Sequence, residues 1–148
     1  MSKRTSLKLI PLGGLGGIGK NMMVFEKDNQ IIIVDCGIMF PDDDMPGIDF
    51  IIPDFSYVKK NKNKVKAIIL THGHEDHIGG LPFLFKEINV PVFATKLTIG
   101  LTKIKFDNSQ KAITIKYNEI NPDKPLDIGP FHIDFFRVNH SIPDGLGL

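Results

Sequence analysis

The chain lacks a second cysteine and a long apolar run, and each of these absences excludes a class of protein. Cys36 has no partner for an internal disulfide, which favours a reducing compartment. No apolar stretch approaches the roughly 20 residues that span a bilayer. The basic residues at the N-terminus are not followed by the apolar segment of a secretory leader. We therefore expect a cytoplasmic protein without a membrane segment.

A large net charge is also absent, because the 148 residues carry a net charge of only +1. This value gives no electrostatic indication of a nucleic-acid partner. What is present is the composition of an ordinary folded domain, 42% hydrophobic and 24% charged, in a chain long enough for one core. The 14 glycines and 10 prolines favour a fold with many turns over a helical bundle.

Apolar periodicity predicts an alternation of strands and helices. Asp28 and Asn29 are expected to form the turn of a hairpin, and Asp54 to cap the first helix. Strand pairs together with helical crossovers predict an α/β layered fold. The expected strands are 6–12, 21–27, 30–35, 65–70, 90–94, 111–120 and 131–139, and the expected helices are 54–60, 81–88 and 96–106.

Three histidines and one aspartate lie within six residues, directly after the buried strand 65–70. Imidazole nitrogens and carboxylates bind zinc and similar cations when several converge on one point. A loop that leaves a rigid strand can direct them there, and Gly73 is expected to give the backbone freedom to turn. The cluster therefore predicts a metal centre, with a solvated polar loop as the alternative. Its members are His72, His74, Asp76 and His77.

The pattern His-x-His-x-Asp-His followed by Gly-Gly resembles the signature of the metallo-β-lactamase superfamily. The surrounding sequence is similar to the ribonuclease J family, which belongs to the β-CASP branch of that superfamily. The resemblance covers essentially the whole chain and implies an αβ/βα metallo-β-lactamase sandwich, of which this chain would hold the N-terminal half only. The segments that carry it are 12–21, 35–41, 47–54 and 95–98.

The resemblance also implies two divalent metal ions, zinc in the first place, with manganese or magnesium as alternatives. His72 and His74 would bind the first ion, and His140, which follows a later strand, would complete its ligands. Asp76 and His77 would bind the second ion.

Two further aspartates receive roles from the resemblance. Asp35, at the end of a buried strand, would orient the ligands from behind instead of binding metal. Together with Asp76 and His77 it makes up the expected catalytic set. Asp49 would contribute to an extra cation, a structural calcium, since calcium prefers oxygen ligands.

In function, the resemblance implies metal-dependent hydrolysis of RNA phosphodiester bonds. The family acts from a 5′-monophosphorylated end and also cuts internally, with water activated by the ions. The bridging aspartate, a late histidine ligand, the β-CASP domain and the C-terminal domain would all lie beyond Leu148. We therefore expect residues 1–148 to be a partial metallo-β-lactamase domain that is inactive alone, from an enzyme that forms homo-oligomers.

Three alternatives remain open at the level of sequence. One is another hydrolase of the same superfamily, such as a glyoxalase II-like thioesterase. A second is a non-catalytic fragment that binds only metal or a partner. The third is a dinucleotide-binding fold, because Gly14, Gly16 and Gly19 follow a strand and Asp35 lies at a suitable distance. That fold requires a helix over 18–27.

Overall fold

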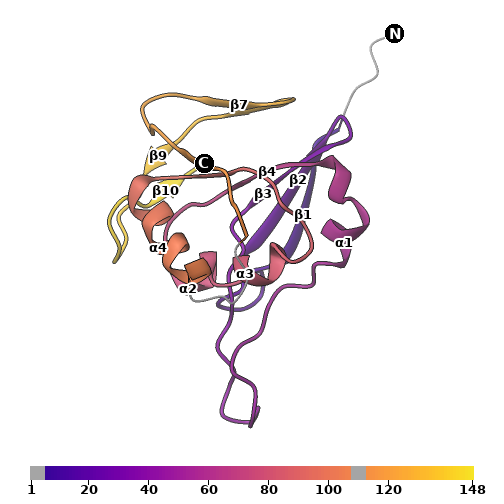
Figure 1. Ribbon diagram of the computed structural model, residues 1–148, viewed down its shortest axis with the longest axis vertical. Helices are drawn as coiled ribbons and strands as arrows, with labels where there is room; N and C mark the ends of the chain where they lie inside the picture. Colours follow the sequence, from indigo (N-terminus) through magenta and orange to yellow (C-terminus); the bar gives the residue numbers. More distant parts are fainter. Residues whose placement is uncertain (1–5, 108–112) are drawn as a thin grey trace.

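Six strands form one mixed sheet in the order β1-β2-β3-β4-β5-β6 in the computed structural model, which describes residues 6–107 and 113–148 (Figure 1). β1 to β3 are antiparallel neighbours, whereas β3 to β6 run parallel. Residues 1–5, where we expect no secretory leader, lie outside the described residues. So do the first two residues of the expected strand 111–120. The bounds are β1 Lys8–Gly13, β2 Met22–Lys27, β3 Gln30–Val34, β4 Val65–Ile69, β5 Val92–Ala94 and β6 Tyr117–Glu119.

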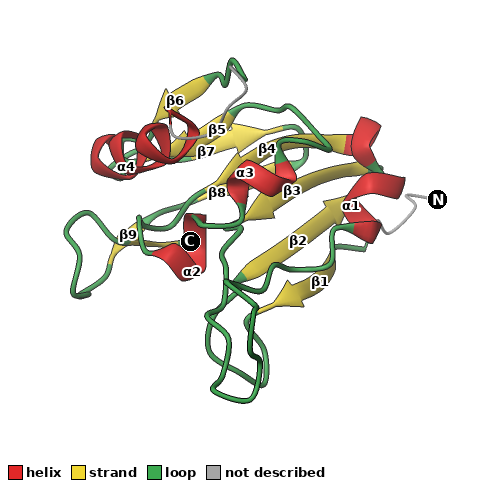
Figure 2. Cartoon of the chain, turned by 60° about the horizontal axis from the view of Figure 1, so that its bottom comes forward, coloured by secondary structure: helices red, strands yellow, loops and turns green. Residues whose placement is uncertain are grey.

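The two faces of this sheet bury different partners, because successive side chains of a strand point to opposite sides. Ile33 and Ile68 pack toward the helices, whereas Ile32 and Ile69 pack toward the later strands. Figure 2 shows the helices on one face and the hairpin β7–β8 on the other. The helices are α1 Ser56–Lys60, α2 Glu75–Ile78, α3 Leu81–Leu84 and α4 Lys96–Asp107, with the short 3-10 turn η1 at Lys62–Lys64. The remaining strands are β7 Leu126–Ile128, β8 Phe131–Ile133, β9 Phe136–Arg137 and β10 Leu146–Gly147.

The predicted hairpin is confirmed, and three other predicted elements are partly wrong. Of the expected strand 111–120, the described residues form a strand only at Tyr117–Glu119. Asp28 and Asn29 have positive φ angles of 50° and 60°, the geometry of a tight hairpin turn between β2 and β3. The expected strand 131–139 is interrupted, because β8 pairs with β7 while β9 pairs with β10. The expected helix 81–88 ends at Leu84. The backbone N–H groups of Lys86 and Glu87 donate to carbonyls three residues earlier, instead of four as in an α-helix.

The first helix begins two residues later than its predicted cap. Asp54 Oδ1 accepts a hydrogen bond of 2.8 Å from the backbone N–H of Ser56, but Phe55 is the N-cap residue and makes no side-chain cap. Within the described residues, none of the helices has the length and apolarity needed to cross a bilayer.

The parallel pair β3 and β4 brings the predicted site together. Both strands end at the same edge of the sheet, so Asp35 and Thr71, which follow them, lie side by side. The backbone N–H of Asp35 donates to the carbonyl of Ile69 at 2.9 Å, which extends the pairing past the last strand residue. The edge of the sheet thus fixes where the histidine loop begins.

Candidate metal centre

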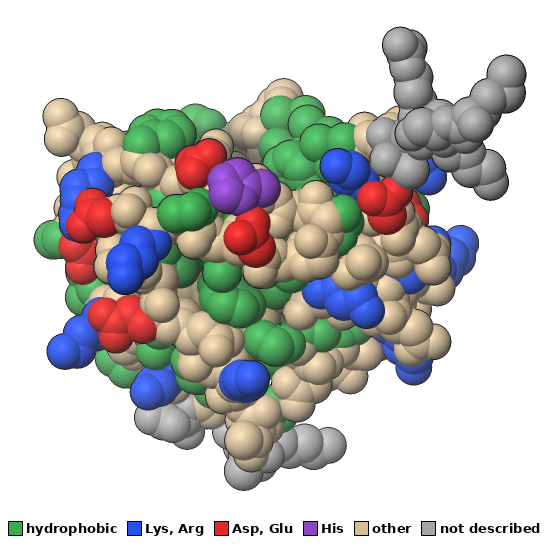
Figure 3. Space-filling view, turned by 90° about the horizontal axis from the view of Figure 1, so that it is seen from above, with side chains coloured by type: hydrophobic (Ala, Val, Ile, Leu, Met, Phe, Trp, Pro, Cys, Tyr) green, Lys and Arg blue, Asp and Glu red, His purple; other side chains and the backbone are tan. Residues whose placement is uncertain are grey.

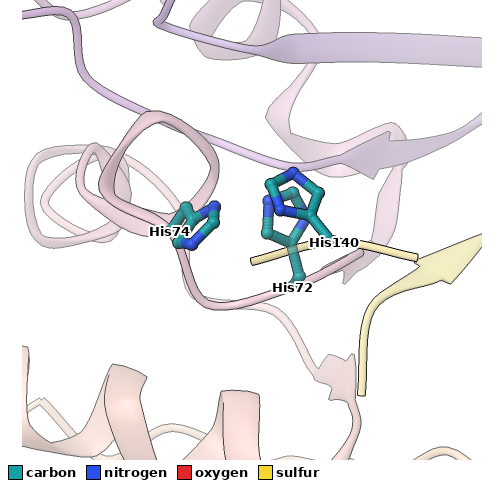
Figure 4. A group of neighbouring side chains, drawn as sticks. All are labelled: His72, His74 and His140. Carbon is teal, nitrogen blue, oxygen red and sulfur yellow. The ribbon is translucent and has the colours of Figure 1, made fainter. Parts of the chain in front are cut away.

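The rings of His72, His74 and His140 face one another just beyond the carboxyl end of β4 (Figure 4). One ligand nitrogen of each lies within 4.8 Å of the others. Ring centroids are 4.8 Å apart for His72 and His74, 4.5 Å for His72 and His140, and 4.6 Å for His74 and His140. Three converging imidazoles are a common ligand set for zinc.

The hydroxyl of the neighbouring Thr71 determines which nitrogen of His72 is left for a cation. The Thr71 hydroxyl donates to Asp35 Oδ2 at 2.8 Å, so its oxygen is left to accept the Nδ1–H of His72 at 2.9 Å. That tautomer leaves His72 Nε2 unprotonated, buried and without a hydrogen-bond partner in the protein. An unpartnered buried polar atom costs about 1–3 kcal/mol, and a bound cation would satisfy it. The residues present therefore fit a metal ion.

The charge state of His72 also suits an ion. Burial lowers the pKa of the His72 imidazole to about 4, and the neighbouring His77, His140 and His74 act in the same direction. The ring is therefore neutral near pH 7, which is the form that binds cations.

Asp35 contacts the histidine loop, where the resemblance predicts a residue that would orient ligands. Its carboxylate accepts hydrogen bonds from the Thr71 backbone N–H at 2.8 Å, the Thr71 hydroxyl at 2.8 Å and His77 Nδ1 at 2.7 Å. Asp35 has a φ of 61°, a left-handed conformation that costs a non-glycine residue about 1–3 kcal/mol. Such strain is retained where surrounding bonds enforce it, and here they aim the carboxylate at the histidine loop.

Asp76 and His77 form a second pair beside the three histidines. His77 Nε2 lies 3.5 Å from Asp76 Oδ2, and its ring centroid is 4.0 Å from that of His72. Burial of the His77 ring opposes its charged form, but the hydrogen bond and charge of Asp35, with the charge of Asp76, outweigh it and raise the pKa. Because Nδ1 is held by Asp35, the nitrogen left to face a cation is Nε2, which lies 3.2 Å from the Asn21 amide nitrogen.

The expected ligands differ in how fully they are buried. His74 is half-buried and occupies the N-cap position of α2 without using its side chain as a cap. His140 is exposed, and the Ser141 N–H donates to its Nδ1 at 2.8 Å. Asp49 is exposed in the loop before α1 and is not a member of the three-histidine group. A calcium ion at Asp49 stays a prediction.

Three features of this region were not assigned correctly from the sequence. Asn21 carries no predicted role, yet its amide nitrogen lies 3.1 Å from Asp76 Oδ2. Gly73 has no positive φ angle, so the expected backbone freedom is not used there; a Cβ would instead lie 2.4 Å from Leu101 Cδ1, the movable end of a side chain. The dinucleotide-binding alternative is wrong, because the segment that it requires as a helix contains strand β2.

Cys36 is packed against the site without belonging to it. Burial raises the pKa of its thiol, and the charge of Asp35 adds to the rise. The sulfur therefore stays protonated at neutral pH, and a protonated thiol is a poor metal ligand.

The sequence model of the metallo-β-lactamase superfamily matches residues 15–143, and the chain belongs to this superfamily. The superfamily binds divalent metals, and the three-histidine cluster could hold one. The metallo-β-lactamase fold protein YhfI of Bacillus subtilis is 25% identical, with a TM-score of 0.65 over 95% of this chain and 56% of that one. A diphosphatase of the PhnP family has a TM-score of 0.64 at 16% identity, over 97% of this chain and 61% of the other, which shows the fold alone. The predicted fold is confirmed.

Two ribonucleases show which members of this superfamily the chain is similar to in sequence. Ribonuclease J 2 of Staphylococcus aureus is 45% identical over 148 residues, which are 99% of this chain and 26% of that protein. Ribonuclease J 1 of Streptococcus pyogenes is 44% identical over 146 residues, with the same coverage of 99% and 26%. The resemblance to ribonuclease J is confirmed, and the chain spans about a quarter of the length of these curated relatives.

Proposed function

We propose that this chain is the metal-binding part of a ribonuclease that hydrolyses RNA phosphodiester bonds with two divalent ions. The observation that carries the proposal is the three-histidine cluster, with the Asp35-oriented pair beside it, in a chain 45% identical to a ribonuclease J. The complete protein would act from a 5′-monophosphorylated end, cut internally as well, form a homo-oligomer and work in the cytoplasm.

The residues of the centre divide into two half-sites. His72, His74 and His140 would hold the first ion, and zinc suits this all-imidazole set. Asp76 and His77 would hold the second ion, for which manganese or magnesium are alternatives since one ligand is a carboxylate. Ions at these positions would supply an activated water and stabilise charge on the phosphoryl oxygens.

The remaining residues orient this machinery. Thr71 and Asp35 select the tautomers of His72 and His77, so that the Nε2 atom of each ring faces the centre. Asp76 stands at the rim, with its side chain 36% exposed, and is the group that a substrate phosphate would meet first.

Two hollows beside Asp76 provide a path for the RNA strand. One, of about 530 Å³, is lined by Asp76 and the glycine-rich loop, and it shares Ile38, Phe40 and Glu75 with a second hollow of about 640 Å³. Phe40 is 64% exposed there and offers a ring on which a base can stack.

Charge contributes less than stacking to this proposed path. Lys105, in the second hollow, is paired with Glu75. Figure 3 views the molecule from above Figure 1, away from these hollows, and on that face too basic side chains of the described residues are mixed with acidic and hydrophobic ones. Binding of RNA would therefore depend on the ions and on base stacking.

The test is a chimera in which this chain replaces the matching 148 residues of the S. aureus relative. We expect it to degrade 5′-monophosphorylated RNA in the presence of divalent ions, and the 148-residue chain alone to be inactive. His72→Ala should abolish the activity of the chimera, whereas His132→Ala, on the exposed hairpin β7–β8, should leave it unchanged. A chimera that cleaves small thioesters but not RNA would overturn the proposal in favour of a thioesterase.

A further inference from the structure

We propose that Asn21 is a positioning residue of the second half-site: its side chain contacts both Asp76 and His77 before an ion binds, and it continues to orient Asp76 once an ion is bound. Asn21 ends the glycine-rich loop and directly precedes β2, far in sequence from the histidine loop. The inference rests on the proposed function only through its metal centre, and it does not depend on RNA as the substrate.

The surroundings of the Asn21 amide define its orientation. Its nitrogen lies 3.1 Å from the backbone oxygen of Asp76, 3.1 Å from Asp76 Oδ2 and 3.2 Å from His77 Nε2. A carbonyl and a carboxylate can only accept, so the amide must present its NH2 group to them. In the neutral ring that binds cations, His77 directs its Nδ1–H to Asp35, which leaves Nε2 as an acceptor as well. Three acceptors therefore surround one donor group.

This surplus of acceptors has a direct consequence for metal binding. An NH2 group carries two hydrogens and cannot satisfy three acceptors together. Without an ion, the hydrogens are shared between Asp76 and the Nε2 lone pair of His77. Once that lone pair is used by a cation, both hydrogens remain available to Asp76. Asn21 therefore orients the carboxylate in both states and gives up only its contact with His77.

Backbone bonds keep Asn21 in place independently of its side chain. Its N–H donates to the carbonyl of Asp76 at 2.9 Å, and its carbonyl accepts from the N–H of Gly37 at 3.0 Å. Substitution of the side chain leaves both bonds intact, so the connection between the glycine-rich loop and α2 should persist. The effect of the amide on metal binding can therefore be separated from an effect on folding.

The experiment uses the 148-residue chain with one equivalent of Zn²⁺ to fill the three-histidine site, followed by titration with Mn²⁺. Broadening of the His77 ring signals in ¹H–¹⁵N spectra reports Mn²⁺ at the second half-site. For Asn21→Ala we expect unchanged zinc uptake and a Mn²⁺ requirement raised by about 10–100-fold, the usual effect of losing a group that orients a ligand. Asn21→Ser, which keeps one donor hydrogen, should fall between Asn21→Ala and the wild type.

Asn89→Ala is the matched control, because that side chain also donates to a backbone carbonyl, Thr114 O at 3.2 Å, away from the centre. It should leave the Mn²⁺ titration unchanged. Equal Mn²⁺ requirements for Asn21→Ala and wild type would overturn the role of Asn21 alone. A wild-type His77 signal that Mn²⁺ never broadens would overturn the second half-site, and the role of Asn21 with it. A wild-type chain that takes up no zinc would overturn the proposed metal centre, and this inference with it.

Discussion

At the scale of single residues, the Thr71 hydroxyl connects the two parts of the centre. Its proton goes to Asp35 and its oxygen accepts from His72, so one small side chain sets the tautomer of a buried ligand. Thr71→Val keeps the shape but removes both bonds, and leaves Asp35 and His72 Nδ1 each short of a partner. Side chains that hydrogen-bond to a metal ligand affect metal affinity even though they never touch the ion.

We predict that Thr71→Val weakens Zn²⁺ affinity by about 10–100-fold and lowers the free energy of unfolding by about 1–3 kcal/mol. Competition with a chelator and chemical denaturation measure the two effects. Thr71→Ser keeps the hydroxyl and should stay close to wild type. If the valine variant bound zinc as tightly as the serine variant, the proposed role of the hydroxyl in fixing the His72 tautomer would be wrong.

A second prediction concerns the buried carboxylate of Glu26 on β2. The Tyr57 hydroxyl donates to it at 2.5 Å and Lys64 at 3.1 Å; these bonds lower the pKa of Glu26 below its ordinary value of 4.5, although burial opposes them. A carboxyl with a lower pKa in the folded state adds stability above pH 4.5, and this stability is lost as the pH falls through the folded value.

Glu26→Gln should therefore be less stable than wild type at pH 7, with the difference shrinking below about pH 4. Urea denaturation across that range measures it. Glu87→Gln, which removes a partly exposed partner of Lys59, should show little change at either pH. A Glu26→Gln deficit that is constant from pH 7 to pH 3 would contradict the lowered pKa.

At the scale of elements, the approach of α2 to the end of β3 determines where Asp76 and His77 lie. The backbone N–H of Cys36 donates to the carbonyl of His77 at 2.8 Å. A Cβ at Gly37 would lie 1.6 Å from the carbonyl oxygen of Asp76, a backbone atom that cannot move alone. Only glycine fits between the loop and the helix at this point.

Gly37→Ala should destabilise the protein by about 3 kcal/mol, the upper end of the usual cost of overpacking, and should reduce metal binding as α2 is displaced. Gly100→Ala is the counterpart in the exposed part of α4, where an added Cβ meets nothing within 4 Å. It should stabilise by about 0.5–1 kcal/mol, because alanine favours the helix. Thermal denaturation of both variants tests these two predictions. A Gly37→Ala variant as stable as wild type would show that the contact between Gly37 and α2 is not tightly packed.

The sequence was informative where a local pattern determines structure. The Asp28-Asn29 turn between two expected strands predicted the hairpin β2–β3, and the continuous apolar run predicted β4 immediately before the histidines. The roles of Asn21 and Gly73 could not be read in this way, since each depends on a contact between segments distant in the chain. Likewise, the break between β8 and β9 arises from a change of pairing partner, which the periodicity of residues 131–139 does not encode.

At the scale of the whole molecule, the first half-site joins segments that are far apart in the chain. His72 and His74 follow β4, whereas His140 comes from the loop between β9 and β10. This loop is attached to the site by the backbone N–H of Leu146, which donates to the carbonyl of Thr71 at 3.0 Å. Metal binding and folding should therefore be coupled, since the unfolded chain offers no such site.

This coupling predicts that Zn²⁺ raises the melting temperature of the chain. At a free concentration of about 100 times the dissociation constant, an ion that binds only the folded state adds about 2.7 kcal/mol. His140→Ala should reduce the increase, and His132→Ala, on the exposed surface of β8, should retain it. An equal response of His140→Ala and wild type would exclude His140 from the ligand set.

The most direct test of the central claim, that this chain assembles a metal centre by itself, is its metal content per chain after purification and dialysis. For the wild type we expect about one or more zinc or manganese ions per chain. A His72→Ala/His74→Ala variant that remains folded should contain none. A well-folded wild-type chain without metal, or a double variant that keeps it, would contradict the claim.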